Sequence, residues 1–420
     1  MSQNKLLSRQ IALHFLKRLD EPDVNTHLLF DGLMNRSDVS DQDKAFVRAL
    51  VLSVLRHQGQ IDFVLSQLLE KKLSAKLKDI QNILRLGVAQ ILYLNVPAHA
   101  TLDTAVELSK HVRQAAFSKF VNGVLRTLER RQSDFQNVSA RYNWPYWLIG
   151  ELKKTYGIKR TESFTQCALN EPPLDLTIRE KQQIWAEKLD GKILQTGSVR
   201  LKGNQKISAL DGFKEGKWWV QNAAASVPVQ LFSDLKGKRV ADLCAAPGGK
   251  TAQLALAGAK VDAFDISEFR LNRLRENMKR LGFQVQTYAT DILLLPDKSV
   301  YDAVLLDAPC SATGTIGRHP EILNRLKKED VARLVSLQKQ LLNQAILLTK
   351  SGGQVVFSTC SLLPDEGEKI MAWALKKYPF LERGKIPAHL TDFQNSAGDI
   401  RITPDFEMDG FFAGLLIKKT

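Results

Sequence analysis

The chain has 420 residues, with 59 Lys and Arg against 45 Asp and Glu, and a net charge of +14. This length predicts roughly two to four domains, and a composition that is 44% hydrophobic and 25% charged excludes a largely disordered chain. The excess of basic residues, without one dense Lys/Arg block, favours a surface that contacts a phosphate backbone. The alternative is that the extra lysines only keep the protein in solution.

The cysteines and the N-terminal segment indicate where the protein works. Cys167, Cys244, Cys310 and Cys360 are too few for a disulfide framework, and no two have the C-x-x-C spacing of a zinc or redox site. Basic residues interrupt the opening MSQNKLLSRQIALHFLKRL, and no apolar run reaches the length of a signal peptide or membrane span. We expect a soluble, cytoplasmic monomer in a reducing compartment, with no metal and no membrane partner.

Residues 1–137 are predicted to form an all-helical domain. Apolar residues recur there at helical spacing. Helix ends are expected at Gly32, Gly59 and Pro97. The region contains no metal, phosphate-loop or nucleophile pattern, so a binding or scaffolding role is expected.

Residues 138–233 are predicted to form a small connecting α+β domain. Pro and aromatic residues mark its start, and short strand-like pieces follow: LDLTI, KILQTG, KISAL and KWWVQN. Trp218 and Trp219 lie near several lysines and offer stacking surfaces for nucleic-acid bases. Burial against the next domain is the alternative, and we favour it.

Residues 234–420 are predicted to form a doubly wound α/β domain of the Rossmann-like type. Five apolar runs alternate with helical patterns: RVADL, KVDAF, QVQTYAT, YDAVLLDAP and GQVVFSTC. In such folds ligands bind at the carboxyl edge of the sheet.

The segment ADLCAAPGGKT places a glycine turn between the first of these strands and a helix. Backbone N–H groups at such a turn hold an anion. A nucleotide-phosphate loop of the Walker type would need Gly where Cys244 stands, and the GxGxxG fingerprint of NAD-binding domains is also absent.

Acidic residues follow the next two strands. Asp265 ends the second strand about 20 residues after the turn, where a carboxylate accepts hydrogen bonds from ribose hydroxyls. Asp291 ends the third, although it could instead cap the following helix. This arrangement favours an adenosine cofactor without a triphosphate, and S-adenosylmethionine fits it.

The fourth and fifth strands each deliver a cysteine, Cys310 and Cys360, to the same edge of the sheet. A thiolate adds readily to C6 of a pyrimidine, and Lys250 or helix N-termini nearby are expected to lower a thiol pKa. Addition at C6 makes C5 nucleophilic enough to take a methyl group, after which a base removes the C5 proton. Asp307 is placed to hydrogen-bond the N3 and N4 edge of the base. The residues alone do not decide which cysteine attacks.

These motifs resemble those of the RNA cytosine-C5 methyltransferases of the Sun family. The resemblance rests on CAAPGGKT, DIS with Arg270, DAPCSATG, RHP, STCS and the closing DGFFAGLLIKK. FVNGVLR and VPAHATLDTAVELSK, in the first domain, are similar to the antitermination factor NusB, a helical RNA-binding fold. Together the two resemblances cover nearly the whole chain.

The resemblance implies a role for each motif residue. It implies that the methionine end of S-adenosylmethionine lies against Cys244, Ala245, Ala246, Pro247, Gly248, Gly249 and Lys250. Asp265 would bind the ribose with Arg270 nearby, Asp291 would lie at the adenine side, and Asp307 would serve both cofactor and base. Cys360 would form the covalent adduct, and Cys310 would assist its breakdown.

The expected activity is therefore methyl transfer from S-adenosylmethionine to C5 of one cytosine in 16S rRNA, either free or in a small-subunit assembly intermediate. The target base has to leave its stack to enter such a pocket. One alternative is the same chemistry on tRNA or 23S rRNA. The other is a non-catalytic RNA-binding or antitermination protein that keeps a degenerate methyltransferase fold.

Overall fold

The computed structural model describes residues 2–19, 21, 24, 26–36, 38–203 and 206–419. Its internal contacts divide the chain into two compact units, Met1–Tyr146 and Trp147–Thr420. The three-domain division, with boundaries at 137 and 233, stays a prediction.

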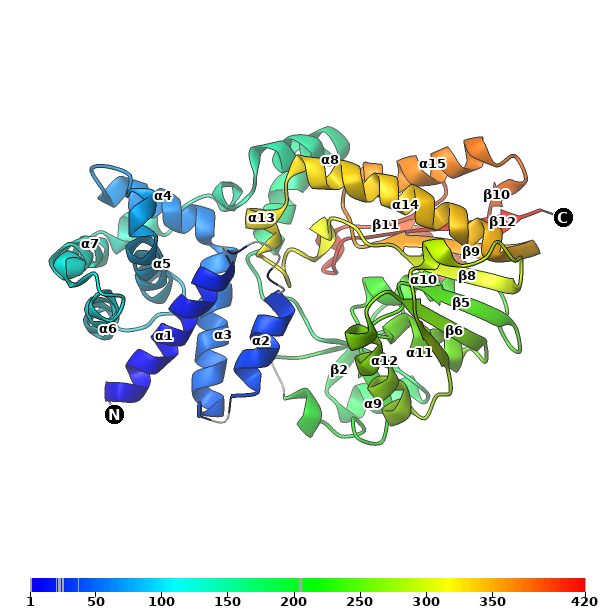
Figure 1. The fold of residues 1–420 in the computed structure, drawn as a ribbon, viewed down its shortest axis with the longest axis horizontal. Helices are drawn as coiled ribbons and strands as arrows, with labels where there is room; N and C mark the ends of the chain where they lie inside the picture. The colour runs from blue at the N-terminus through cyan, green and yellow to red at the C-terminus, as the bar shows by residue number, and fades with distance from the viewer. Residues whose placement is uncertain are drawn as a thin grey trace. The chain divides into compact units, whose positions relative to one another are not determined.

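The first unit is helical, as predicted (Figure 1). Its α-helices are α1 (Ser2–Leu19), α2 (Thr26–Met34), α3 (Asp41–Arg56), α4 (Gln58–Leu68), α5 (Lys78–Leu92), α6 (Ala98–His111) and α7 (Ser118–Arg130). Short 3-10 turns are η1 (Ala75–Leu77), η2 (Ala115–Phe117), η3 (Gln132–Phe135) and η4 (Ala140–Asn143). The core forms around α5, which contacts α1, α3, α4, α6 and α7 and whose residues Ile80, Ile83 and Leu84 are fully buried.

The glycine and proline positions do not end helices as predicted. Gly32 lies inside α2, and Gly59 lies in the first turn of α4. At Gly59 an added Cβ would collide with the backbone carbonyl of Tyr142, so this glycine permits close helix packing. Pro97 precedes α6 as its N-cap, whereas α5 already ends at Leu92.

The second unit begins with α8 (Tyr146–Cys167), which is interrupted at Gly157, and a small antiparallel sheet. The strands are β1 (Asp175–Ile178), β2 (Gly191–Ile193), β3 (Val199–Leu201) and β4 (Trp218–Val220), in the order β2-β3-β1-β4, with α9 (Gln182–Lys188). The prediction of a strand at KISAL is wrong: it forms the 3-10 turn η5 (Ile207–Ala209), which has no buried residue. Trp218 and Trp219 are both buried. Trp219 packs against residues of the larger sheet and its helices, as favoured, whereas Trp218 lies in the core of the small sheet itself.

A larger sheet follows and confirms the Rossmann-like prediction. Its strands are β5 (Arg239–Leu243), β6 (Lys260–Asp265), β7 (Gln286–Ala289), β8 (Tyr301–Asp307), β9 (Thr349–Thr359), β10 (Leu381–Arg383), β11 (Ile400–Ile402) and β12 (Phe411–Lys418). The order is β10-β12-β9-β8-β5-β6-β7, with β11 paired to β12. The five predicted strands are parallel, and β12 joins β9 antiparallel.

Helices cover both faces of this sheet (Figure 1). They are α10 (Val227–Gln230), α11 (Gly249–Leu256), α12 (Glu268–Leu281), α14 (Lys328–Leu348) and α15 (Glu368–Lys377). The one-turn helix α13 (Ile322–Arg325) lies in the segment between β8 and α14. The 3-10 turns are η6 (Ala224–Ser226), η7 (Ile292–Leu294), η8 (Thr313–Thr315), η9 (Pro364–Glu366), η10 (Ala388–Phe393) and η11 (Pro404–Phe406). Alternate strand residues pack on α14 and α15 on one face and on α10, α11 and α12 on the other. The parallel strands therefore end at one edge, which carries the site.

Candidate active site

The turn between β5 and α11 has a backbone that allows close approach by a ligand. Cys244 and Gly248 have φ values of 61° and 101°, in the left-handed region. A Cβ at Gly248 would lie 2.8 Å from Leu274 Cγ, so glycine is required there. The helix α11 begins at Gly249 without a side-chain cap, which leaves its first N–H groups available to an anion.

The backbone N–H groups that precede α11 in this turn already donate hydrogen bonds within the protein. The N–H of Ala245 donates to Phe264 O, and the N–H of Gly248 donates to Ala245 O, each at 2.9 Å. A carboxylate at this turn would therefore meet the start of α11 rather than the first part of the loop.

Asp265 is buried at the end of β6 and ties this strand to the turn. Its carboxylate accepts from the N–H of Ala246 at 3.2 Å and from that of Ser267 at 3.0 Å. Arg270 lies 3.3 Å from the same carboxylate and also donates to Ala246 O at 2.5 Å. The structure thus brings together Asp265, Arg270 and the turn, and Oδ1 of Asp265, which accepts only from Ser267, keeps a second lone pair for a hydroxyl donor.

Asp242 is a candidate site residue that the sequence analysis missed. It is fully buried on β5, and Thr251 donates to its Oδ2 at 2.6 Å, while its Oδ1 has no hydrogen-bond partner. Burial raises the pKa of Asp242 to about 7. An unpartnered buried carboxylate oxygen beside the glycine turn fits a ligand cation, such as the ammonium group of S-adenosylmethionine. The signal available in the sequence was an acid within an otherwise apolar strand.

Asp291 lies two residues beyond the end of β7 and has a local partner. Its side chain caps η7 by accepting from the N–H of Leu293 at 3.0 Å. The capping alternative therefore describes what Asp291 does in this structure. No hydrogen bond or ion pair links it to Asp265 or to the glycine turn among the residues that the structure describes.

Asp307 ends β8 and is held by residues from two other elements. Lys250 Nζ, on α11, lies 2.7 Å from Asp307 Oδ2, and Ser358 Oγ, on β9, donates to Oδ1 at 2.9 Å. From the sequence, Lys250 is expected to lower a thiol pKa. The structure instead pairs its ammonium with Asp307.

Cys310 and Cys360 meet at the ends of the adjacent parallel strands β8 and β9. Their Sγ atoms are 3.5 Å apart, and both side chains are partly exposed. The contact with Cys360, burial, and the nearby negative charges of Cys360 and Glu366 raise the pKa of Cys310 well above its ordinary value. Cys310 is therefore held as a thiol, contrary to the expected lowering.

The other two cysteines have different surroundings. Burial and the carboxylates of Asp307, Asp265 and Asp242 raise the pKa of Cys244 to about 12, so it stays protonated. Cys167 lies at the end of α8 and is free. Neither is placed as a nucleophile.

Two of the motifs that carried the resemblance meet beside the cysteines. Arg318, of RHP, donates to Asp409, of the closing motif, at 2.7 Å and to Pro173 O at 2.9 Å. The N–H of Gly314 donates to Cys360 O at 2.9 Å, and that of Gly410 donates to Gly314 O at 2.8 Å. These contacts join the loops after β8 and β9 to the start of β12.

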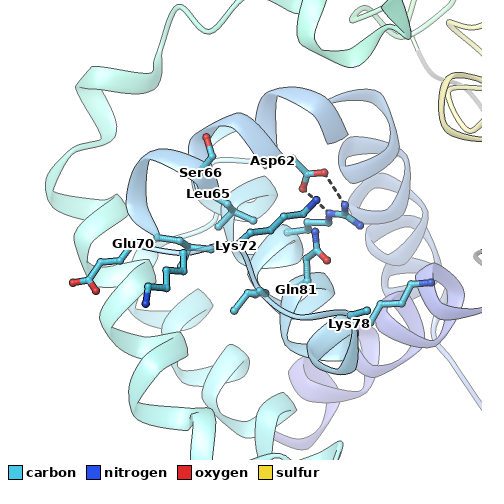
Figure 2. A pocket seen from close by; sticks show the side chains of 12 residues that line it. Asp62, Leu65, Ser66, Glu70, Lys72, Lys78 and Gln81 are labelled. Carbon is cyan, nitrogen blue, oxygen red and sulfur yellow. Dashed lines mark hydrogen bonds and ion pairs between the residues drawn. The ribbon is translucent and has the colours of Figure 1, made fainter.

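A pocket of about 840 Å³ lies in the first unit, between α4 and α5 (Figure 2). It is lined by Asp62, Leu65, Ser66, Leu69, Glu70, Lys71, Lys72, Leu73, Ala75, Lys78, Gln81 and Arg85. Arg85 pairs with Asp62 at 2.7 Å. Lys71 and Lys72 are exposed, and neither has an ion pair within the described part of the chain. None of the predicted site residues lines this pocket.

Two features are absent from the residues that the structure describes. No helix in these ranges is long and apolar enough to cross a bilayer. Likewise, no cluster of three or more His, Cys, Asp or Glu in them is suited to a metal ion.

Comparison with known families supports both parts of the fold. The family model "16S rRNA methyltransferase RsmB/F" matches residues 229–417, and the NusB family model matches residues 7–130. A Klebsiella pneumoniae (strain 342) ribosomal RNA small subunit methyltransferase B is 32% identical over 437 residues, which cover 99% of each chain. The Escherichia coli O127:H6 protein of the same name is 34% identical over 402 residues, covering 91% of this chain and 92% of that one.

Solved structures show the same architecture. The crystal structure of PH0851 has a TM-score of 0.77 at 23% identity and covers 98% of both chains, which supports the fold. A methyltransferase homologue from Pyrococcus horikoshii has a TM-score of 0.56 at 26% identity, over 66% of this chain and 95% of that one.

The predicted enzyme class and cofactor are confirmed by these matches: the protein is an rRNA methyltransferase that uses S-adenosylmethionine. Relatives above 30% identity span nearly all of this chain and of their own length. The chain therefore belongs to the RsmB family of ribosomal RNA small subunit methyltransferases.

Proposed function

We propose that this protein methylates C5 of a specific cytosine in 16S rRNA through a covalent adduct between Cys360 and C6 of the base, with Cys310 assisting release. The observation that carries the proposal is the pair of Sγ atoms 3.5 Å apart, at the carboxyl ends of β8 and β9 and after Asp307 on β8. Pyrimidine C5 needs a nucleophile at C6 before it can accept a methyl group.

The charge that the cysteine pair can carry gives the two residues different roles. Two thiolates in such close contact repel each other, so the pair carries one negative charge at a time. The raised pKa of Cys310 favours its thiol form and supports the assignment of the attack on C6 of the base to Cys360. S-adenosylmethionine, when bound, supplies an electrophilic methyl group for the electron-rich C5.

Release of the product reverses the roles. In the adduct Cys360 Sγ is bonded to C6 and neutral, which removes the like charge beside Cys310 and lets Cys310 lose its proton to solvent. The Cys310 thiolate then takes the C5 proton, the C6–S bond breaks, and its electron pair returns to Cys360. Asp307 would hydrogen-bond the N3 and N4 edge of the base, where its carboxylate accepts from the N4 amino group.

We assign the cofactor contacts to residues around the glycine turn. The first N–H groups of α11, at Gly249 and Lys250, would hold the carboxylate of S-adenosylmethionine, and the unpartnered Oδ1 of Asp242 would hold its ammonium group. Asp265 would accept the ribose hydroxyls, and Asp291 would lie at the adenine side.

The first unit would contribute RNA binding. Lys71 and Lys72 at the pocket between α4 and α5 offer charge to a phosphate backbone. We further place the enzyme in the cytoplasm, because its four free cysteines suit a reducing compartment. We propose that it acts as a monomer, and that its substrate is free 16S rRNA or an assembly intermediate.

Methyl transfer to defined RNAs tests this function. With labelled S-adenosylmethionine, 16S rRNA should acquire 5-methylcytosine at one position, as read by nucleoside mass spectrometry and bisulfite sequencing. Cys360→Ala should abolish the label without loss of cofactor binding. Label in tRNA or 23S rRNA alone would contradict the substrate, and a fully active Cys360→Ala variant would contradict the mechanism.

A further inference from the structure

Glu366 is a fully buried carboxylate directly behind the two cysteines. It ends η9, and its Oε1 accepts from the N–H of Ser311 at 2.9 Å and from Gln338 at 3.0 Å. Its Oε2 accepts from Ser361 Oγ at 2.6 Å and from Ser311 Oγ. No ion pair reaches Glu366 from any residue that the structure describes. Burying an anion among neutral donors is costly, so packing alone does not account for it.

The donors to Glu366 are the neighbours of the reactive residues. Ser311 follows Cys310 on the loop after β8, and Ser361 follows Cys360 on the loop after β9. The hydroxyls of Ser311, Ser361 and Thr313 also lie 3.2–3.3 Å from one another. One carboxylate thus joins both loops at the residue next to each thiol.

We infer that Glu366 is a positioning residue that holds Cys310 and Cys360 at their working separation through Ser311 and Ser361. This inference rests on the proposed function for its catalytic meaning, but the spacing itself is a property of the free protein. Glu366 does not touch the base. Its negative charge also favours the thiol form of Cys310, in keeping with the raised pKa of that residue.

Oxidative cross-linking measures the spacing without substrate. Diamide takes one hydrogen from each thiol and leaves a Cys310–Cys360 disulfide, which requires the sulfur atoms to approach from 3.5 Å to about 2 Å. We expect Glu366→Ala to slow this reaction about tenfold at fixed pH, with the disulfide detected by peptide mass spectrometry. Removing the charge alone would favour thiolate and speed the reaction, so slowing reports geometry.

Conservative and distant variants supply the controls. Glu366→Gln keeps an oxygen for Ser311 N–H and an amide that can donate to the serine hydroxyls, so its cross-linking rate should return to within about threefold of wild type. Asp262→Asn removes another buried carboxylate of the same sheet, bonded to Arg239 and Tyr301 at the starts of β5 and β8, and should leave the rate unchanged. If Glu366→Ala does not fold, Ser311→Ala and Ser361→Ala each remove one arm and should slow cross-linking.

Activity gives a second readout. In Glu366→Ala, kcat should fall about 100-fold while KM for RNA and cofactor changes little, and Glu366→Gln should restore most of kcat. Wild-type rates of cross-linking in Glu366→Ala would overturn the positioning role and leave the methyltransferase proposal standing. If Glu366→Ala slows cross-linking but the wild-type protein forms no 5-methylcytosine, the proposed function is contradicted and the positioning role stands.

Discussion

At the scale of the residue, the site depends on carboxylates held away from water. Asp242, Asp265 and Glu366 are all buried. Each accepts a hydrogen bond from a distant residue: Asp242 from Thr251, Asp265 from Ala246, and Glu366 from Ser311, which follows Cys310. Only Asp242 keeps an unpartnered oxygen. That difference is the basis for proposing Asp242 as a ligand-binding residue, whereas Asp265 and Glu366 hold segments of the chain together.

The pH dependence of stability tests the state of Asp242. Its folded-state pKa of about 7 lies above the ordinary value of 3.8, so between these values the native protein binds more protons than the unfolded chain. The free energy of unfolding of the cofactor-free protein should therefore fall as the pH rises from about 4 to 7, by at most about 1.4 kcal/mol per pH unit from this group, and the penalty is complete above 7.

Asp242→Asn isolates this contribution in urea unfolding measured over the same pH range. The variant lacks the titrating group, so the stability of wild type relative to the variant should decrease with rising pH. S-adenosylmethionine should bind the variant more weakly, since the ammonium partner is lost. Parallel pH profiles for the two proteins would mean that Asp242 is ionised throughout.

At the scale of the element, sequence patterns predicted most strands and the site edge but not the contacts between distant segments. Apolar runs after Gly and Pro located β5, β6, β8 and β9 because a buried parallel strand needs a continuous apolar run, whereas β7, at the edge of the sheet, is largely exposed. The prediction of a strand at KISAL failed because its two half-buried residues, Ile207 and Leu210, are three positions apart, which suits one 3-10 turn rather than the alternation of a strand. The prediction of a helix end at Gly59 failed because this glycine is needed for close contact with the backbone of Tyr142, which lies far away in the sequence.

The same limit applies to the site. The ends of parallel strands share one edge, so the meeting of Cys310 and Cys360 followed from topology. The pairing of Lys250 with Asp307 and the role of Glu366 join residues 57 and 55 positions apart in the chain, and no periodicity encodes such pairs.

At the scale of the whole molecule, the net charge of +14 is spread over a chain that works on RNA. Each phosphate contact by Lys or Arg releases counterions, so RNA affinity should fall steeply with added salt. Lys71 and Lys72 line the pocket of Figure 2 and contribute to that charge, and neither forms an ion pair with a residue that the structure describes.

Charge reversal at this pocket tests its contribution. Lys71→Glu with Lys72→Glu should weaken 16S rRNA binding and reduce the slope of log K against log salt by about 1 to 2. Lys71→Arg with Lys72→Arg keeps the charge and should bind as wild type does. Filter binding or fluorescence anisotropy over a salt series gives both quantities, and an unchanged slope in the Glu variant would remove the pocket from the RNA contact.

The covalent intermediate is the most direct test of the central claim. Cys310→Ala removes the residue that takes the C5 proton, so this variant, incubated with S-adenosylmethionine and 16S rRNA, should accumulate an RNA–protein adduct that survives denaturation. Mass spectrometry should place the bond between Cys360 Sγ and C6 of a methylated cytosine. An adduct that is absent, or that persists in the Cys310→Ala, Cys360→Ala double variant, would contradict the mechanism.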